Sequence, residues 1–232
     1  MAPVATENGR SLVAQAMDAV KAHIRDSGLR VGDNLPGEGF FADRLGVSRA
    51  VMREAFGALA ALRLIDVANG RRAKVGALDG SVIADSLEHA LSTAQIKVAD
   101  VWDVRRTIEM RTAALAARNA TPTQAARIVA LAEAMGRDDQ PHDDTTEQDI
   151  EFHLAIAEAS GNALFRQIVV SFVPLMRVAV PQAWKTRQTE AEKSDILERH
   201  RTLARSIADR DPEEAERWMS MHFDDTIGAL LR

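Results

Sequence analysis

A helical spacing of apolar residues, broken once at Gly46, constrains the first part of this chain more than any other feature. Within residues 35–76 the apolar positions recur at helical intervals on both sides of that glycine, at Ala42, Leu45, Val47, Val51, Ala55, Leu59 and Leu62. Glycine adopts left-handed backbone angles at little cost and so allows a tight turn between two short helices. Ser48 is placed to cap the second helix. The sequence therefore predicts a helix-turn-helix.

The second of these helices carries cationic side chains on the face away from its apolar stripe. Arg49 and Arg53 are one helical turn apart and share that face. Such a helix can enter a DNA major groove, with its cations toward phosphates and guanine edges. Helical hairpins with a surface arginine or two are also common without this role, so a further signal is needed.

A short basic hairpin supplies that signal. Residues 64–67 alternate like a strand, Asn69-Gly70 is a strong hairpin turn, and residues 71–75 return with three cations. A basic hairpin after a basic second helix is the charge pattern of a winged helix on duplex DNA. We expect Arg49 to read a base, Arg53 to contact a base or a phosphate, and the hairpin cations to hold the backbone or minor groove. The expected DNA-binding residues are Ser48, Arg49, Arg53, Arg71, Arg72 and Lys74.

Charge divides the chain into two parts. Residues 10–76 carry 11 Lys and Arg against 7 Asp and Glu, a net charge of +4. The remaining residues carry a net charge of −9, which brings the whole chain to −5. A basic segment joined to an acidic one indicates two modules with different partners. We therefore predict a winged helix-turn-helix domain at residues 10–76 and an all-helical domain at residues 81–232, with a short linker between them.

Composition excludes several other classes. The 232 residues include no cysteine, so disulfides and thiolate chemistry are unavailable, which suits a reducing cytoplasm. No apolar run approaches the ~18 residues that a membrane span needs, and the N-terminus lacks a signal-peptide core. Tyrosine is absent and aromatics are few, which argues against a base-stacking platform for single strands. We expect a cytoplasmic protein with no membrane partner.

Helical periodicity runs through all of the second module. Thr121-Pro122 and Asp211-Pro212 each place a capping residue before a proline at the first helical turn, and Pro174 should kink its helix. The fold class is therefore mainly α, with a C-terminal bundle of six or seven helices. The predicted helices of this module are 81–94, 98–119, 122–137, 145–159, 162–184, 189–209 and 212–231.

Three histidines in this module occupy positions where an apolar residue is expected. Asp149 and His153 are four residues apart on one helix, and His200 and His222 fall in the apolar stripes of two others. Together they could bind a divalent metal, zinc first, with nickel, manganese or iron as alternatives, and leave positions for water or an anion. Two other interpretations stay open: each histidine is a satisfied core residue, or the metal activates water in a metal-dependent hydrolase. No additional base is placed beside the cluster, so we expect no enzyme.

Arg105 is a cation within an apolar stripe, where it is costly unless paired. It could pair with Glu109 one turn later or extend out to solvent. It could instead hold a ligand carboxylate, because its planar guanidinium gives a bidentate grip. A metal and an arginine facing one cavity would suit a small hydroxy- or keto-carboxylate, such as a sugar acid or an organic acid.

The N-terminal half resembles the GntR family of bacterial winged-helix regulators. That family's Leu-Pro-x-Glu stretch reads Leu35-Pro36-Gly37-Glu38 here, and its second motif corresponds to the run from Leu45 to Ala55, shifted by one residue after Arg49. The C-terminal half resembles the all-helical effector domain, or FCD domain, of the FadR-like branch. The matching pieces include Asp149 to His153, Ala159 to Asn162 and Asp211 to His222.

The resemblance implies a homodimer that binds a short palindromic operator in double-stranded DNA and responds to a small carboxylate. It implies a repressor, a metal site at Asp149, His153, His200 and His222, and effector contacts at Arg105 and Asn162. It also places the DNA-reading arginines at Arg49 and Arg53 and the wing tip at Gly70. Gly39 departs from the family, in which many members carry an arginine three residues after the proline.

Overall fold

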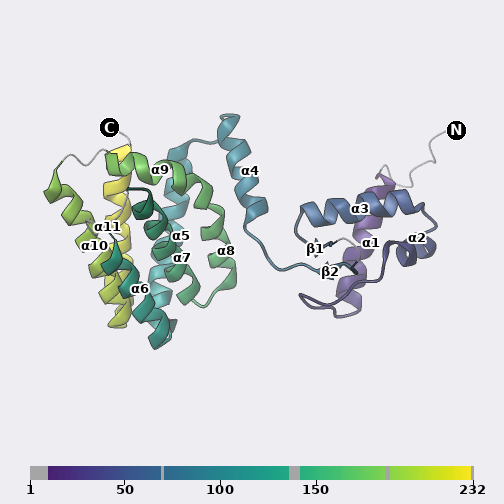
Figure 1. Ribbon diagram of the computed structural model, residues 1–232, viewed down its shortest axis with the longest axis horizontal. Helices are drawn as coiled ribbons and strands as arrows, with labels where there is room; N and C mark the ends of the chain where they lie inside the picture. The colour runs from purple at the N-terminus through teal and green to yellow at the C-terminus, as the bar shows by residue number, and fades with distance from the viewer. Residues whose placement is uncertain (1–9, 69–70, 136–141, 186–188, 231–232) are drawn as a thin grey trace. The chain divides into compact units, whose positions relative to one another are not determined.

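The computed structural model describes residues 10–68, 71–135, 142–185 and 189–230. Its contacts divide the chain into two compact units, Met1–Asp79 and Gly80–Arg232. The described residues form eleven helices and two short strands, joined by turns and loops (Figure 1). The predicted fold class, mainly α with an N-terminal winged helix-turn-helix and a C-terminal helical bundle, is confirmed.

The first unit contains three helices and a two-stranded antiparallel sheet. The sheet pairs Ile65 with Val75 and Asp66 with Lys74. The elements are α1 (Leu12–Asp26), α2 (Glu38–Leu45), α3 (Arg49–Ala61), β1 (Ile65–Asp66) and β2 (Lys74–Val75).

The turn between α2 and α3 forms as the sequence predicts. Gly46 ends α2 with a φ of 66°, in the left-handed region. Ser48 begins α3, and its side-chain oxygen accepts a hydrogen bond from the Val51 backbone N–H at 3.2 Å. The capping oxygen satisfies one of the four N–H groups that a helix leaves unpaired at its start.

A small hydrophobic core fixes these helices. Met52 and Leu59 of α3 are fully buried, and Phe41 and Phe56 lie with their ring centroids 5.9 Å apart. Burying each such side chain contributes about 1.5–3 kcal/mol. Because the buried residues occupy one face of α3, the opposite face is left for solvent or a partner.

The wing is shorter than predicted in its paired part. Two residues pair from each strand, and the predicted Asn69-Gly70 turn lies outside the described residues. The segment around Leu35 also bonds to β2 and the residue before it: the Leu35 N–H donates to the Ala73 carbonyl at 2.7 Å and the Val75 N–H donates to the Asp33 carbonyl at 2.9 Å. Burial of Leu35 draws this segment against the sheet.

The second unit is helical throughout its described residues. Helix α5 packs against α7 and α11, and α10 packs against α6 and α11. Its helices are α4 (Ser81–Ser92), α5 (Val98–Asn119), α6 (Pro122–Ala134), α7 (His142–Ala159), α8 (Ala163–Ser171), α9 (Val173–Lys185), α10 (Glu190–Ala208) and α11 (Pro212–Leu230).

One predicted helix is two helices in the structure. The segment predicted at 162–184 breaks at Phe172, and α8 and α9 meet at a bend of 53°. Pro174 is the second residue of α9, where its missing N–H costs no helical hydrogen bond. Within the described residues no single helix is long and apolar enough to cross a membrane, and α8 with α9 reaches that length and composition only as a bent pair.

Candidate functional site

Four buried side chains from three helices converge inside the second unit. One ligand atom from each lies within 4.8 Å of the others. Asp149 and His153 stand one turn apart on α7, His200 comes from α10, and His222 comes from α11. These are the four residues that the sequence predicts as metal ligands, and the fold brings all four together.

The orientation of His153 is fixed by Glu109 on α5. The His153 Nδ1 is in hydrogen-bond contact with a Glu109 carboxylate oxygen. Burial raises the pKa of Glu109, but the charges and hydrogen bonds of Arg105 and His153 more than offset this, so the pKa lies below its ordinary value. The ionised carboxylate can only accept, so Nδ1 donates to it, and Nε2 is the ring nitrogen that faces the cluster.

A backbone carbonyl orients His200 so that its Nε2, like that of His153, faces the cluster. Its Nδ1 lies 2.8 Å from the Ile196 carbonyl, which only accepts, so Nδ1 donates there. Its Nε2 then lies 3.1 Å from Asp149 Oδ1. Burial raises the pKa of Asp149, but the hydrogen bond from His200 and the nearby His153 more than offset this, so the pKa is depressed and the group is a carboxylate.

The donor set fits a divalent cation. Among the described residues, His153 Nε2 has no hydrogen-bond partner, and it lies 3.9 Å from Asp149 Oδ1. Burial, and then the charges of His200 and His153, hold the pKa of His222 well below its ordinary value, so this imidazole is neutral. A divalent cation would take the place of the proton between His200 Nε2 and Asp149, and three imidazole nitrogens with one carboxylate oxygen suit zinc, nickel, manganese or iron.

Arg105 connects this cluster to a neighbouring cavity. Its Nε donates to Glu109 Oε1 at 2.5 Å, and its guanidinium carbon lies 4.6 Å from the centroid of the Trp102 ring. The Arg105–Glu109 pair considered from the sequence therefore forms, and it is buried. The sequence did not show that Glu109 also reaches His153, because the two residues are 44 positions apart.

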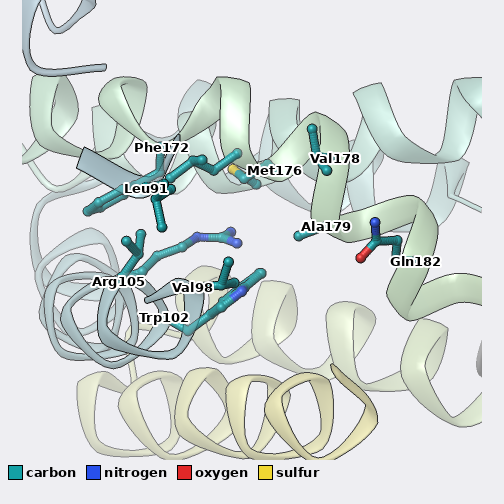
Figure 2. Close-up of a pocket in the computed structure, with 11 residues that line it drawn as sticks. Leu91, Val98, Trp102, Arg105, Phe172, Met176, Val178, Ala179 and Gln182 are labelled. Atoms are coloured by element: carbon teal, nitrogen blue, oxygen red, sulfur yellow. The ribbon is translucent and has the colours of Figure 1, made fainter. Parts of the chain in front are cut away.

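The cavity has a volume of about 140 Å³ and is bordered by α4, α5 and α9. Figure 2 shows the Arg105 guanidinium extending between Leu91 and Met176 on one side and Val98 and Trp102 on the other. The structure places Asn162 elsewhere: its side-chain oxygen accepts from the Leu164 and Phe165 N–H groups at the start of α8. An effector contact at Asn162 stays a prediction.

The cations predicted to bind DNA are all exposed in the first unit. Arg49 and Arg53 lie on the face of α3 opposite its buried residues, and Arg53 makes a long contact of 3.9 Å with Glu38. A Cβ on Gly39 would lie 3.8 Å from the Arg49 guanidinium. The position at which this chain differs from the family pattern is therefore next to Arg49. Ser48, Arg71, Arg72 and Lys74 are exposed as well. Their roles on DNA stay predictions.

Comparison with known proteins gives two matches to protein families. Residues 12–75 match the family described as bacterial regulatory proteins, gntR family, and residues 100–225 match the FCD domain. The second match alone covers more than half of the chain.

Individual proteins agree with these matches. The chain is 27% identical to the HTH-type transcriptional regulator LutR of Bacillus subtilis, over 89% of this chain and 95% of that protein. It is 28% identical to the galactonate operon transcriptional repressor of Escherichia coli, over 80% and 82% respectively. Among solved structures, Streptococcus agalactiae GntR matches with a TM-score of 0.62 at 25% identity, over 91% of this chain and 97% of that one. These relatives are regulators of transcription and not enzymes.

Proposed function

The chain belongs to the GntR family of bacterial regulatory proteins and carries an FCD domain, and we propose that it is a metal-containing repressor controlled by a small carboxylate. The convergence of Asp149 and three histidines beside the Arg105 cavity carries this proposal. A buried metal site next to a cavity with a single cation suits the sensing of a small anion.

The metal site would be formed by Asp149, His153, His200 and His222. A divalent ion there supplies a Lewis-acid centre for an oxygen ligand. Glu109 and the Ile196 carbonyl hold two of the imidazoles in the tautomer that binds metals. Arg105 offers its guanidinium to the ligand carboxylate, since Nη2 has no hydrogen-bond partner among the described residues.

The DNA-binding surface would be the exposed face of α3 with the wing. Arg49 reads a base, Arg53 contacts a base or a phosphate, and Ser48, Arg71, Arg72 and Lys74 contact the backbone or minor groove. A homodimer presents two such surfaces to the half-sites of a palindromic operator in the cytoplasm. The names of relatives support repression: one of them represses a galactonate operon.

Effector binding would change the distance between the two DNA-binding units of the dimer, so that this distance matches the spacing of the operator half-sites either better or worse. A coupling free energy of about 1–3 kcal/mol between the two sites is sufficient for regulation. The metal-dependent hydrolase considered from the sequence has no support from the relatives, which are regulators.

Two measurements test the proposal. Gel-shift titration of the DNA upstream of the protein's own gene should show a sequence-specific complex that a carboxylate weakens. Elemental analysis of tag-free protein should show about one divalent metal per chain, and His200→Ala should lose it. Wild-type protein that binds no fragment of its own promoter would refute the DNA-binding part, and metal-free wild-type protein would refute the metal part.

A further inference from the structure

The lining of the Arg105 cavity, as far as the structure describes it, carries a single cation. Arg105 is the one charged residue among the eleven that line the cavity within the described part of the chain. Its side chain is 3% exposed, and its Nη2 makes no hydrogen bond there. A buried donor left unpaired has lost its hydrogen bonds to water and gained none in return. A ligand carboxylate would remove that cost and add a charge-assisted hydrogen bond.

The remaining walls are apolar. Leu91, Val98, Phe172, Met176 and Ala179 surround the guanidinium with hydrocarbon. The Gln182 amide is an exposed group set apart from Arg105, beyond Ala179 in Figure 2. A ligand with several hydroxyl groups would therefore bury most of them without hydrogen-bond partners, which is unfavourable. An apolar body would instead gain from burial.

Size and charge limit the ligand further. The cavity volume of about 140 Å³ is close to the ~150 Å³ of an apolar cavity that accommodates benzene. One aromatic ring or a chain of about six carbons fills such a space. None of the four candidate metal ligands is among the described residues that line the cavity, so a second carboxylate on the ligand would be buried against hydrocarbon without a counter-charge.

We infer that the cavity between α4, α5 and α9 binds a monocarboxylic acid with an apolar body, either one aromatic ring or a short aliphatic chain, and that it excludes polyhydroxylated acids. The inference rests on the proposed function in taking a carboxylate as the effector. It narrows the proposed effector from small carboxylates in general to apolar monocarboxylic acids.

Calorimetric titration of the full-length protein as purified tests this selectivity. Benzoate and hexanoate are the probes, galactonate tests the polyhydroxylated class, and benzyl alcohol tests the need for a carboxylate. Benzoate or hexanoate should bind at least tenfold more tightly than either comparison compound. Equal or tighter binding of galactonate would overturn the inference, and so would equal binding of benzyl alcohol.

A cavity-filling variant shows where the acid binds without disturbing the ion pairs. Ala179→Met should weaken benzoate binding at least tenfold, because the longer side chain occupies the cavity. Ala191→Met, on the exposed start of α10, is the matched control and should leave binding unchanged. Circular dichroism checks that both variants fold. Unchanged affinity in a folded Ala179→Met would place the acid elsewhere and overturn the inference.

A parallel titration on operator DNA separates this inference from the proposed function. If galactonate binds and releases the operator while benzoate does neither, repressor control stands and the apolar-acid inference falls. If benzoate binds in the cavity but no acid changes the affinity for operator DNA, the inference of an apolar acid is supported and control by a carboxylate is refuted.

Discussion

At the scale of single residues, a chain of three side chains links the cavity to the metal cluster. Arg105 faces the cavity and pairs with Glu109, and Glu109 holds the imidazole of His153. A ligand bound at Arg105 would therefore be connected to the proposed metal site through one carboxylate. Neither helix could contribute this link alone, since α5 carries the first two residues and α7 carries the third.

Glu109→Gln should lower the affinity for zinc by about 10–100-fold, the range seen when a partner behind a metal-binding histidine is removed. The amide can still fill the space, but it no longer holds the His153 proton as a carboxylate does. Competition with a coloured chelator measures the affinity. Glu151→Gln is the control, because Glu151 forms an exposed pair with Arg127. Equal loss in both variants would show that Glu109 does not orient the metal site.

Arg49→Ala and Lys74→Ala should weaken DNA binding in different ways. Arg49→Ala should cost about 1–3 kcal/mol on the operator and relax the preference at one base pair. Lys74→Ala should weaken binding to all sequences alike and reduce the slope of log K against log salt by about 1. Fluorescence anisotropy over a salt series checks both. Binding like the wild type in both variants would contradict the proposed surface.

At the scale of elements, the arrangement of α2 and α3 depends on local signals. Gly46 supplies the left-handed residue that ends α2, and Ser48 caps α3. Gly57 is different: it lies on the exposed face of α3 in line with Arg49 and Arg53, and a Cβ there would meet no atom within 4 Å. Its effect on stability is thus the ordinary cost of a glycine inside a helix.

Gly57→Ala should raise the free energy of unfolding by about 0.5–1 kcal/mol, because alanine loses less backbone entropy on forming a helix. Gly46→Ala should lower it by about 1–2 kcal/mol, because alanine is strained at a φ of 66°. Urea unfolding followed by circular dichroism measures both. A stabilising Gly46→Ala would show that the turn is not held in its left-handed form.

Local sequence signals predicted most of these elements, and tertiary contacts account for what they missed. Thr121 and Asp211 cap α6 and α11 as predicted, because a cap depends on residues within one turn. The pairing of the segment around Leu35 with β2 could not be predicted, since it joins residues about 40 positions apart. The same holds for Glu109 and His153. Asn162, which the family resemblance implies as an effector contact, caps α8 in the structure.

At the scale of the whole molecule, two units of opposite charge carry the two proposed activities. The basic N-terminal segment suits DNA, and the acidic remainder contains the Arg105 cavity and the buried cluster proposed to bind a metal. A metal that binds the folded helical unit, and not the unfolded chain, stabilises that unit by mass action.

Chelation should therefore lower the thermal stability of the helical unit. Saturating zinc at about 100 times its dissociation constant stabilises the folded state by about 2.7 kcal/mol. Calorimetry with zinc or with a chelator should show a shift in the wild type and none in His200→Ala. If neither zinc nor the chelator changes the unfolding temperature of the wild type, a structural metal is excluded.

The central claim is that one chain both binds an operator and senses a carboxylate. Fluorescence anisotropy of a labelled fragment from upstream of its own gene, with benzoate, hexanoate or galactonate added, tests both parts together. We predict a sequence-specific, salt-sensitive complex whose affinity falls about 5–150-fold with at least one of these acids. Failure to bind any such fragment at low ionic strength, with and without the acids, would contradict the account.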